Sequence, residues 1–316
     1  MTGYIAIIGS LPTVYLWIVR ERKKEEELKN KQQEINQIKI SELNKVYVDA
    51  VNQFFDDKTF IAGAYALLAL VDDWINMSRE YNQKVKDYYP RVSQISLIIF
   101  SAQKNNYNNK LFTSIINELL QKIISLEKSS EDFSFNWSKV SLDKLSSFRL
   151  DLTNVKLPNI VIENSNLSFM DMDNIVFTNA QLNYTDFKGS TLESAHFLFA
   201  DLNSADFGGA DLTRANLTGA KLIKANFLYA DILGAKLIGA DLTGADLVGA
   251  HLIGADLTRA HLIGANLTRA NLTGANLTGV NLTDAALTDA VLTDADLTDT
   301  ILTGTILDGT DLTKNL

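Results

Sequence analysis

Residues 240–260 read "ADLTGADLVGAHLIGADLTRA", and one five-residue unit occurs there four times. Each unit has a small residue (position i−2), then Asp, Asn or His (i−1), then a central Leu (i) and two variable residues (i+1 and i+2). Side chains of a strand alternate between its two faces, so i−2 and i point to the same side. Both i+1 and i+2 must then lie outside before the next small residue points inward. A straight strand cannot do this, so the chain is predicted to bend every five residues and to coil.

The five-residue frame runs without insertion from Trp137 to Leu312, which gives 36 units. The match is strict from Ala195 to Leu297, and Gly is common at i+2, where a corner benefits from its backbone freedom. In the first units larger residues replace Ala at i−2, and Ser147 stands at an i position, so irregular first coils are expected. The larger residues are Val140, Leu145, Leu150, Val155, Ile160, Met170 and Ile175.

This unit closely resembles the motif A-[D/N]-L-x-x of the pentapeptide repeat family. The resemblance implies a mainly β fold over residues 133–316, a right-handed quadrilateral parallel β-helix with four units in each coil. The 36 units would then form nine coils, and stacked strands about 4.8 Å apart make a rod about 43 Å long. An open end of a repeat array exposes unpaired backbone groups. We therefore expect helices to cap the first coil and the uncapped last coil to stack on a second copy of the chain.

Charge divides the chain into two parts. The 316 residues carry a net charge of −9, and residues 133–316 hold 12 basic and 21 acidic residues, which accounts for all of it. An acidic surface repels the phosphate backbone, so direct binding of nucleic acid is not expected. The chain has no Cys, which excludes disulfides and thiolate metal sites.

Residues 1–19, "MTGYIAIIGSLPTVYLWIV", contain no charged side chain, and "RERKK" follows at once. Nineteen helical residues just cross a hydrocarbon core about 30 Å thick. A cleaved signal peptide needs positive charge before the apolar run and a small-residue cleavage site after it, and neither is present. We predict a single-pass transmembrane anchor, with the basic cluster and the repeat domain in the cytoplasm. A buried or partner-binding helix is the alternative.

Two helical segments are expected between the anchor and the repeats. Residues 20–44 are polar and rich in helix formers, with Glu25–Lys29 and Glu27–Lys31 pairs, and predict a charged helical stalk. Residues 45–130 place apolar residues three and four apart and predict an α-helical capping domain, interrupted at Pro90. The small residues of "IAGAYALLAL" (61–70) allow helices to approach closely.

No arrangement in the repeats predicts catalysis, a cofactor or a metal site. His196, His251 and His261 all fall at the outward i−1 position, and His251 and His261 lie on opposite faces of a four-unit coil. The outward Asp residues alternate with other side chains in each stack, which relieves repulsion at strand spacing. We therefore predict that the protein is not an enzyme.

Two outward features are predicted to form an interface with a protein partner. The first, called the apolar band, is a set of apolar residues at i+1, where Thr is the commonest residue. The second, called the acidic collar, is a set of Asp at i+2, one on each corner of a late coil. The apolar band is Ile223, Leu228, Leu233, Ile238, Val248, Ile253 and Ile263, and the acidic collar is Asp284, Asp289, Asp294 and Asp299.

These features favour a non-enzymatic, membrane-anchored scaffold that presents an acidic β-helical rod to an unknown protein partner. The family resemblance implies an alternative, because some pentapeptide repeat proteins are similar to B-form DNA in width and charge and modulate DNA gyrase. The predicted anchor and the basic residues on the rod, such as Arg214 and Arg259, weigh against that role. A carbohydrate-active β-helix is disfavoured because no carboxylate pair stands in a cleft.

Overall fold

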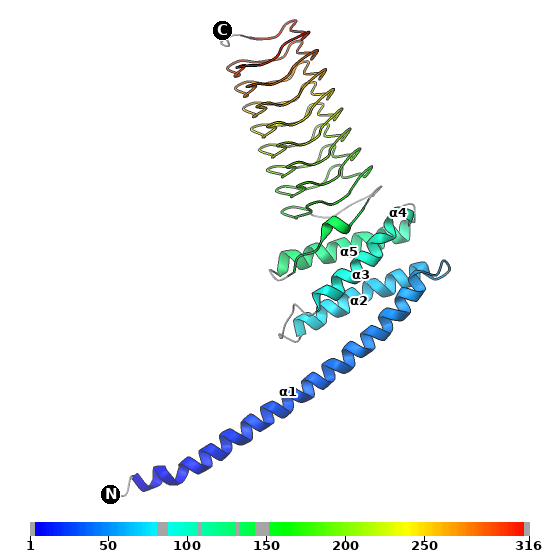
Figure 1. Cartoon of the computed structure of the whole chain (residues 1–316), viewed down its shortest axis with the longest axis vertical. Helices are drawn as coiled ribbons and strands as arrows, with labels where there is room; N and C mark the ends of the chain where they lie inside the picture. Colours follow the sequence, from blue (N-terminus) through cyan, green and yellow to red (C-terminus); the bar gives the residue numbers. More distant parts are fainter. Residues whose placement is uncertain (1–3, 81–87, 107–108, 131–132, 143–151, 313–316) are drawn as a thin grey trace. The chain divides into compact units, whose positions relative to one another are not determined.

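The structure is a computed structural model that describes residues 4–80, 88–106, 109–130, 133–142 and 152–312. The side chains of residues 4–14, 16, 17, 78–80, 104 and 139 lie outside the description. The chain forms two compact units, residues 1–73 and 74–316, and each is described by itself. Figure 1 shows the helices of the N-terminal part and the stacked coils of the repeats.

The first unit is built on helix α1 (Tyr4–Phe54), which has 51 residues and is therefore about 77 Å long. The helix runs unbroken through residues 19 and 44, so the predicted anchor, stalk and start of the capping domain share one element. Most side chains of the predicted anchor, residues 1–14, 16 and 17, lie outside the described residues. The predicted division into domains stays a prediction.

Helix α2 (Phe60–Glu80) follows α1 after a short turn that Asp56 and Thr59 stabilise. The Asp56 carboxylate accepts hydrogen bonds from the Lys58 and Thr59 amides, and the Thr59 hydroxyl donates to the Gln53 carbonyl, 2.9 Å away. A Cβ on Gly63 would overlap the backbone at Phe54. The glycine of the small-residue segment therefore allows the two helices to approach closely, as the sequence predicted.

The helices of the second unit are α3 (Tyr89–Ser101), α4 (Gln103–Asn106) and α5 (Lys110–Ser129), followed by the 3₁₀ turn η2 (Trp137–Lys139). Pro90 lies in the first turn of α3, where its missing N–H is tolerated. The Asn109 side chain caps α5 by accepting from the Leu111 and Phe112 amides. One face of α5 is buried, which explains the spacing of its apolar residues. These buried residues are Phe112, Ile115, Ile116, Leu119, Leu120, Ile123, Ile124 and Leu126.

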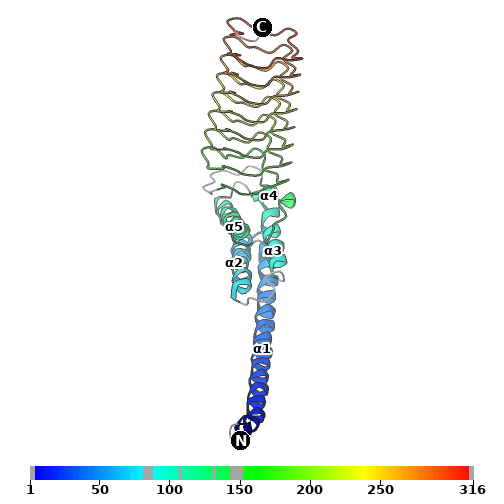
Figure 2. The ribbon, with the colours of Figure 1, turned by 90° about the vertical axis from the view of Figure 1, so that its left-hand side faces the viewer.

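The repeats form stacked coils of four units each, as Figure 2 shows from the side. Parallel β-bridges join i−1 residues that are 20 positions apart, from Ser141–Val161 to Val291–Asp311. From Leu152 to Ala295 the residues at i−2 and i are buried, as the five-residue pattern predicted. The prediction of a mainly β fold needs one correction, because the described residues contain single bridges and no extended strand. The chain turns every five residues, so each side of the coil is too short for a longer ladder.

Every corner residue, at i+2, from Asn154 to Gly309 has a positive φ, whether or not it is glycine. At most corners the next i−2 amide donates to the preceding i carbonyl, as Ala195 does to Leu192 at 3.0 Å. This pattern is typical of a type II turn, whose third residue requires a positive φ. The sequence predicted the benefit of glycine here, but the corners also carry Asn, Asp, Ser, Arg, Lys, Phe and Tyr.

The interior of the rod is filled by ladders of stacked apolar side chains, and within a ladder the same residue type often recurs. Phe187, Phe207 and Phe227 stack in one ladder with ring centroids 4.9 and 5.0 Å apart and nearly parallel planes. The distance between these rings matches the distance between neighbouring strands, about 4.8 Å. Each ring in the ladder therefore comes from one coil, and the ladder runs along the axis of the rod.

The two ends of the repeats are less regular. Trp137 is buried but lies in the 3₁₀ turn rather than in a coil, and Leu145, Ser147 and Leu150 lie outside the described residues. At the other end Leu302 is 42% exposed, because the last described coil has no further coil above it. The predicted stacking of this coil on a second copy stays a prediction.

Candidate functional site

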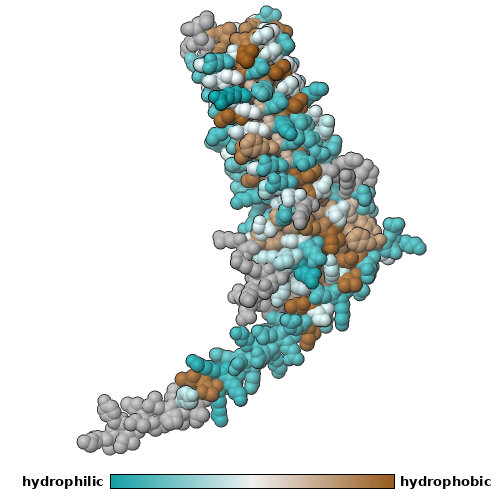
Figure 3. Space-filling model, in the orientation of Figure 1, coloured by the Kyte–Doolittle hydropathy of each residue, from teal (hydrophilic) through white to brown (hydrophobic). Residues whose placement is uncertain are grey.

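The apolar band lies in coils 223–263 and is spread over all four faces of the rod. Leu228, Ile253 and Ile263 are 36–39% exposed, and the other members are half-buried. The 20-residue bridging places Leu228 beside Val248 on one face and Leu233 beside Ile253 on the next. Figure 3 shows brown, hydrophobic patches interrupted by teal, polar ones over the visible side of the repeats. The structure thus brings four of the seven predicted residues together as two pairs, and the role of the band as an interface stays a prediction.

The acidic collar lies at four successive corners of one coil. Asp284, Asp289, Asp294 and Asp299 are exposed and have φ values of 56–58°. Asp tolerates this backbone region better than most residues. Asp289 faces Arg269 of the preceding coil, with 3.9 Å between Oδ2 and Nε.

The outward i−1 residues form columns in which charges of opposite sign meet. Lys221 lies 3.5 Å from the Asp201 carboxylate, and Nδ1 of His251 lies 2.6 Å from Asp231. His196, His251 and His261 are exposed, and His251 and His261 stand in separate columns. Within the part of the chain that the structure describes, His, Cys, Asp and Glu form no group of three that could hold a metal ion.

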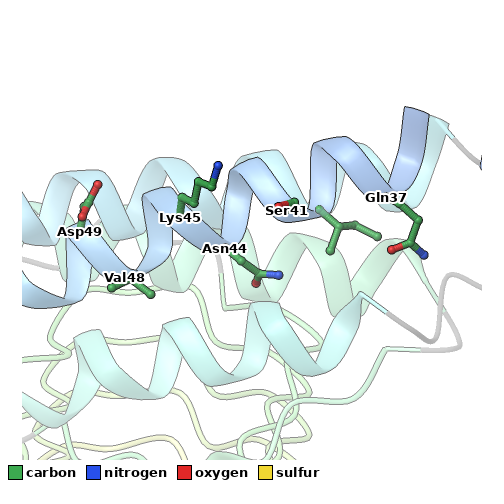
Figure 4. A pocket seen from close by; sticks show the side chains of 7 residues that line it. Gln37, Ser41, Asn44, Lys45, Val48 and Asp49 are labelled. Carbon is green, nitrogen blue, oxygen red and sulfur yellow. The ribbon is translucent and has the colours of Figure 1, made fainter. Parts of the chain in front are cut away.

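Two hollows lie in the helical part. One, of about 660 Å³, runs beside α1 and is lined by polar side chains such as Gln37, Asn44 and Lys45 (Figure 4). The other, of about 480 Å³, lies where the end of α5 meets the start of the repeats, and its lining includes Glu127, Trp137 and Lys156. Among the described residues that line these two hollows, no nucleophilic side chain is paired with a base.

Glu127 links α5 to the segment that enters the repeats. Its carboxylate accepts hydrogen bonds from the Phe135 amide at 2.8 Å and from Nε1 of Trp137 at 3.1 Å. Burial raises the pKa of Glu127, and these two hydrogen bonds and the nearby Lys156 oppose that effect. Both oxygens are thus engaged in joining two elements, which is a structural role.

The sequence reasoning missed four aromatic side chains that point outward from corners of the rod. Phe169, Tyr184, Phe199 and Tyr229 are 60–82% exposed, although all four have positive φ values. Their i+2 position, which five-residue counting assigns to the outside, was the available signal. A small residue follows each one 20 positions later, and for Phe169, Phe199 and Tyr229 it is glycine.

Stacked four-sided coils with buried i−2 and i residues define a solenoid of the β-helix class. The sequence model of the family described as pentapeptide repeats matches residues 162–197, 200–237, 235–274 and 275–313, in eight copies. Residues 162–313 therefore consist of pentapeptide repeats, the sequence pattern of a family whose fold is a right-handed β-helix. No curated protein matches the chain in sequence.

Several solved structures are similar to the repeats. HetL, a pentapeptide repeat protein involved in heterocyst differentiation regulation in Nostoc sp. strain PCC 7120, is 28% identical over 52% of this chain and 91% of its own, with a TM-score of 0.17. A trypsin-treated form of QnrB1, a plasmid-mediated fluoroquinolone resistance protein, is 23% identical over 55% and 90%, with a TM-score of 0.25. A pentapeptide repeat protein from the Arabidopsis thaliana thylakoid lumen is 33% identical over 36% and 70%, with a TM-score of 0.17.

One described segment, Phe60–Met77 in α2, is long and apolar enough to cross a membrane. Half of this segment is buried within the protein, and Leu67, Leu70 and Val71 are at most 1% exposed. Packing against the protein core accounts for its apolar character, so the segment is weak support for a membrane location.

Proposed function

We propose that this chain is a non-enzymatic interaction protein, a membrane-anchored scaffold that presents an acidic β-helical rod to a protein partner. Pentapeptide repeat proteins are generally structural or interaction proteins. The observation that carries the proposal is the apolar band. Thr is the commonest residue at the outward i+1 positions, but Leu228, Ile253 and Ile263 keep more than a third of their surface in contact with solvent. Apolar surface that remains exposed in this way is typical of interaction sites.

The distribution of charge supports the same region. Residues 211–270, which contain the apolar band, hold five acidic and six basic residues, whereas residues 271–312 hold seven acidic residues and no basic one. Residues 152–210 are also acidic, with seven acidic and two basic residues. The band therefore lies in the part of the rod with the least net charge, where acidic and basic residues nearly balance. The acidic parts on both sides would guide a partner with a basic rim.

A pull-down with the full-length chain tests the band. We compare the wild type with a variant that changes Ile223, Leu228, Val248 and Ile263 to Thr, the commonest residue at this position. A matched control changes four outward threonines of later coils to Ser: Thr273, Thr278, Thr283 and Thr288. Loss of a specific partner by the first variant alone supports the proposal. Equal capture by all three proteins removes the apolar band as the interface.

The membrane anchor is the part of the proposal that rests on residues 1–19. At the described end of this segment Tyr15, Ile18 and Val19 are 39–68% exposed, which leaves apolar surface free for lipid. The chain without residues 1–19 is compared with the full chain after cell fractionation and an alkaline wash. We expect only the full chain to remain with the membranes, and protease added outside to leave the repeats intact. A full chain released by the wash refutes the anchor.

Modulation of DNA gyrase is the second candidate function, and the net charge of the rod favours it. Residues 152–312 hold 19 acidic and 8 basic residues, a net charge of −11 over about 38 Å of rod. The basic residues interrupt this charge where Arg214, Lys221 and Lys224 lie close in sequence, which is why the scaffold is preferred. A supercoiling assay with purified chain separates the two, because a scaffold leaves gyrase activity unchanged.

A further inference from the structure

One corner of the rod carries two exposed aromatic rings on either side of a bare glycine. This aromatic corner is the column of i+2 residues Phe169, Gly189, Gly209, Tyr229 and Gly249, each 20 positions from the next. Phe169 is 82% exposed and Tyr229 is 63% exposed. Their φ values are 56° and 54°, in a region that bulky side chains rarely adopt. An exposed aromatic side chain held in an unfavourable backbone conformation points to a role outside folding.

Each ring lies over the glycine of the next coil. A Cβ on Gly189 would be 2.6 Å from the Phe169 ring, and one on Gly249 would be 2.5 Å from the Tyr229 ring. Gly209 stands between them, and no atom lies within 4 Å of the position of its missing Cβ. Because Phe169 and Tyr229 are three coils apart, their backbones are separated by about 14 Å. The corner thus presents two flat aromatic faces with an open notch between them.

Carboxylates line one side of this corner. Asp171, Asp211 and Asp231 each lie at i−1, two residues after a corner residue, and parallel bridges place them in one column with Thr191 and His251. Nδ1 of His251 lies 2.6 Å from Asp231, so within the described part of the rod Asp171 and Asp211 are the carboxylates of this column that have no cationic neighbour. The i+1 column on the other side contributes one cation, Lys188. That ammonium group is bound to the Asp206 carboxylate at 2.8 Å. The surface around the rings is therefore negatively charged.

We propose that the aromatic corner binds an arginine-bearing segment of a protein partner. A guanidinium group is planar, is weakly hydrated, stacks on aromatic faces and forms paired hydrogen bonds with carboxylates. Phe169 and Tyr229 offer the faces, the Asp column offers the carboxylates, and Gly209 leaves room for the side chain. Lysine fits less well because its ammonium group is compact and strongly hydrated. The inference rests on the proposed function of the rod as an interaction module.

Other classes of ligand fit this surface less well. Nucleic acids and anionic membranes are repelled by the Asp column. A neutral carbohydrate would stack on the rings but would make no use of the negative charge, and the Phe169 ring offers it no hydrogen bond.

The test uses the full chain and two fluorescent peptides that differ only in carrying arginine or lysine at the same positions. Binding is followed by fluorescence anisotropy at low and at physiological salt. The first test variant is Tyr229→Asn, which introduces a residue that other corners carry. The second is Asp211→Asn, whose side chain still offers an acceptor to the Thr213 amide, 2.9 Å away in the wild type. The matched control is Phe199→Asn, on another corner. Phe199 is 60% exposed and lies over Gly219, but the neighbouring Asp201 already faces Lys221.

We expect the arginine peptide to bind the wild type more tightly than the lysine peptide at both salt concentrations. Tyr229→Asn and Asp211→Asn should each weaken binding of the arginine peptide by about tenfold, the usual effect of removing a central contact. Phe199→Asn should leave binding unchanged. Equal affinities for the two peptides, or equal binding by all variants, would overturn the proposal. Binding of a neutral oligosaccharide or of anionic vesicles that Tyr229→Asn abolishes would overturn it as well. Failure here leaves the outcome of the apolar-band pull-down, and so the scaffold function, untouched.

Discussion

Replacement of Phe207 should reveal how the rod depends on its internal ladders. Phe207 is fully buried and stacks between Phe187 and Phe227, and its ring also meets Phe197 edge-on, with centroids 6.0 Å apart. Phe207→Ala removes the ring and leaves a cavity that the repeating backbone cannot close. Large-to-small changes of this kind cost about 3–5 kcal/mol of unfolding free energy. Loss of the two stacked contacts places this variant at the upper end of that range.

Phe207→Leu should be much milder, because Leu is the residue at i in most units and stands in the same ladder at Leu247, one coil beyond Phe227. We expect a loss of about 1–1.5 kcal/mol, mainly from the aromatic contacts. Urea denaturation followed by far-UV circular dichroism measures both variants. The control is Phe199→Asn, which removes an exposed ring from the outside of a neighbouring coil.

The expected order of unfolding free energies is wild type, then Phe207→Leu, then Phe207→Ala, with Phe199→Asn near the wild type. A smaller denaturant slope for Phe207→Ala would mean that the coils on its two sides unfold separately, as repeat arrays can. Equal midpoints for Phe207→Ala and Phe199→Asn would show that the ladder does not stabilise the rod, and the account of its core would be wrong.

Three further changes test other parts of the structure. Gly249→Ala should lower the unfolding free energy by at least about 1 kcal/mol, because its φ is positive and its Cβ would meet the Tyr229 ring. Gly254→Asn, where no atom lies close to the position of the new Cβ, should be neutral in the same urea titration. Asn109→Ala should cost about 1 kcal/mol by removing the cap of α5, with a correspondingly lower melting temperature as the readout. For Glu127, whose folded-state pKa is raised, the stabilisation by the carboxyl group is complete below the unfolded value of about 4.5 and is lost as pH rises through the folded value. The unfolding free energy of the wild type relative to Glu127→Gln should therefore fall as pH increases over that window, and a constant difference would refute the assignment.

The coiled architecture was predictable because each unit fixes its own geometry. The period of five forces a bend, and the small residue at i−2 and the Leu at i identify the inner face without knowledge of any contact. The same reasoning could not assign the corner conformation, because φ at i+2 is set by the turn and not by the residue there. Phe169 and Tyr184 therefore went unnoticed, although their outward position followed from the frame.

The candidate interface was predictable only in outline. Counting by 20 placed Leu228 beside Val248, but exposure depends on how far each neighbouring side chain extends, which the pattern does not contain. Glu127 was missed for a different reason. Its two hydrogen-bond donors, Phe135 and Trp137, come from a segment that precedes the regular coils, and no periodicity marks where that segment meets α5.

The four-unit coil also restricts how such a rod can change in length. Loss or gain of one unit would turn everything downstream by a quarter of a revolution, so that Phe169 and Tyr229 would no longer share an edge. Loss or gain of 20 residues would shift the downstream surface along the rod axis without rotating it about that axis. Where more than one edge of the rod must meet the same partner, insertions and deletions that survive should therefore come in whole coils.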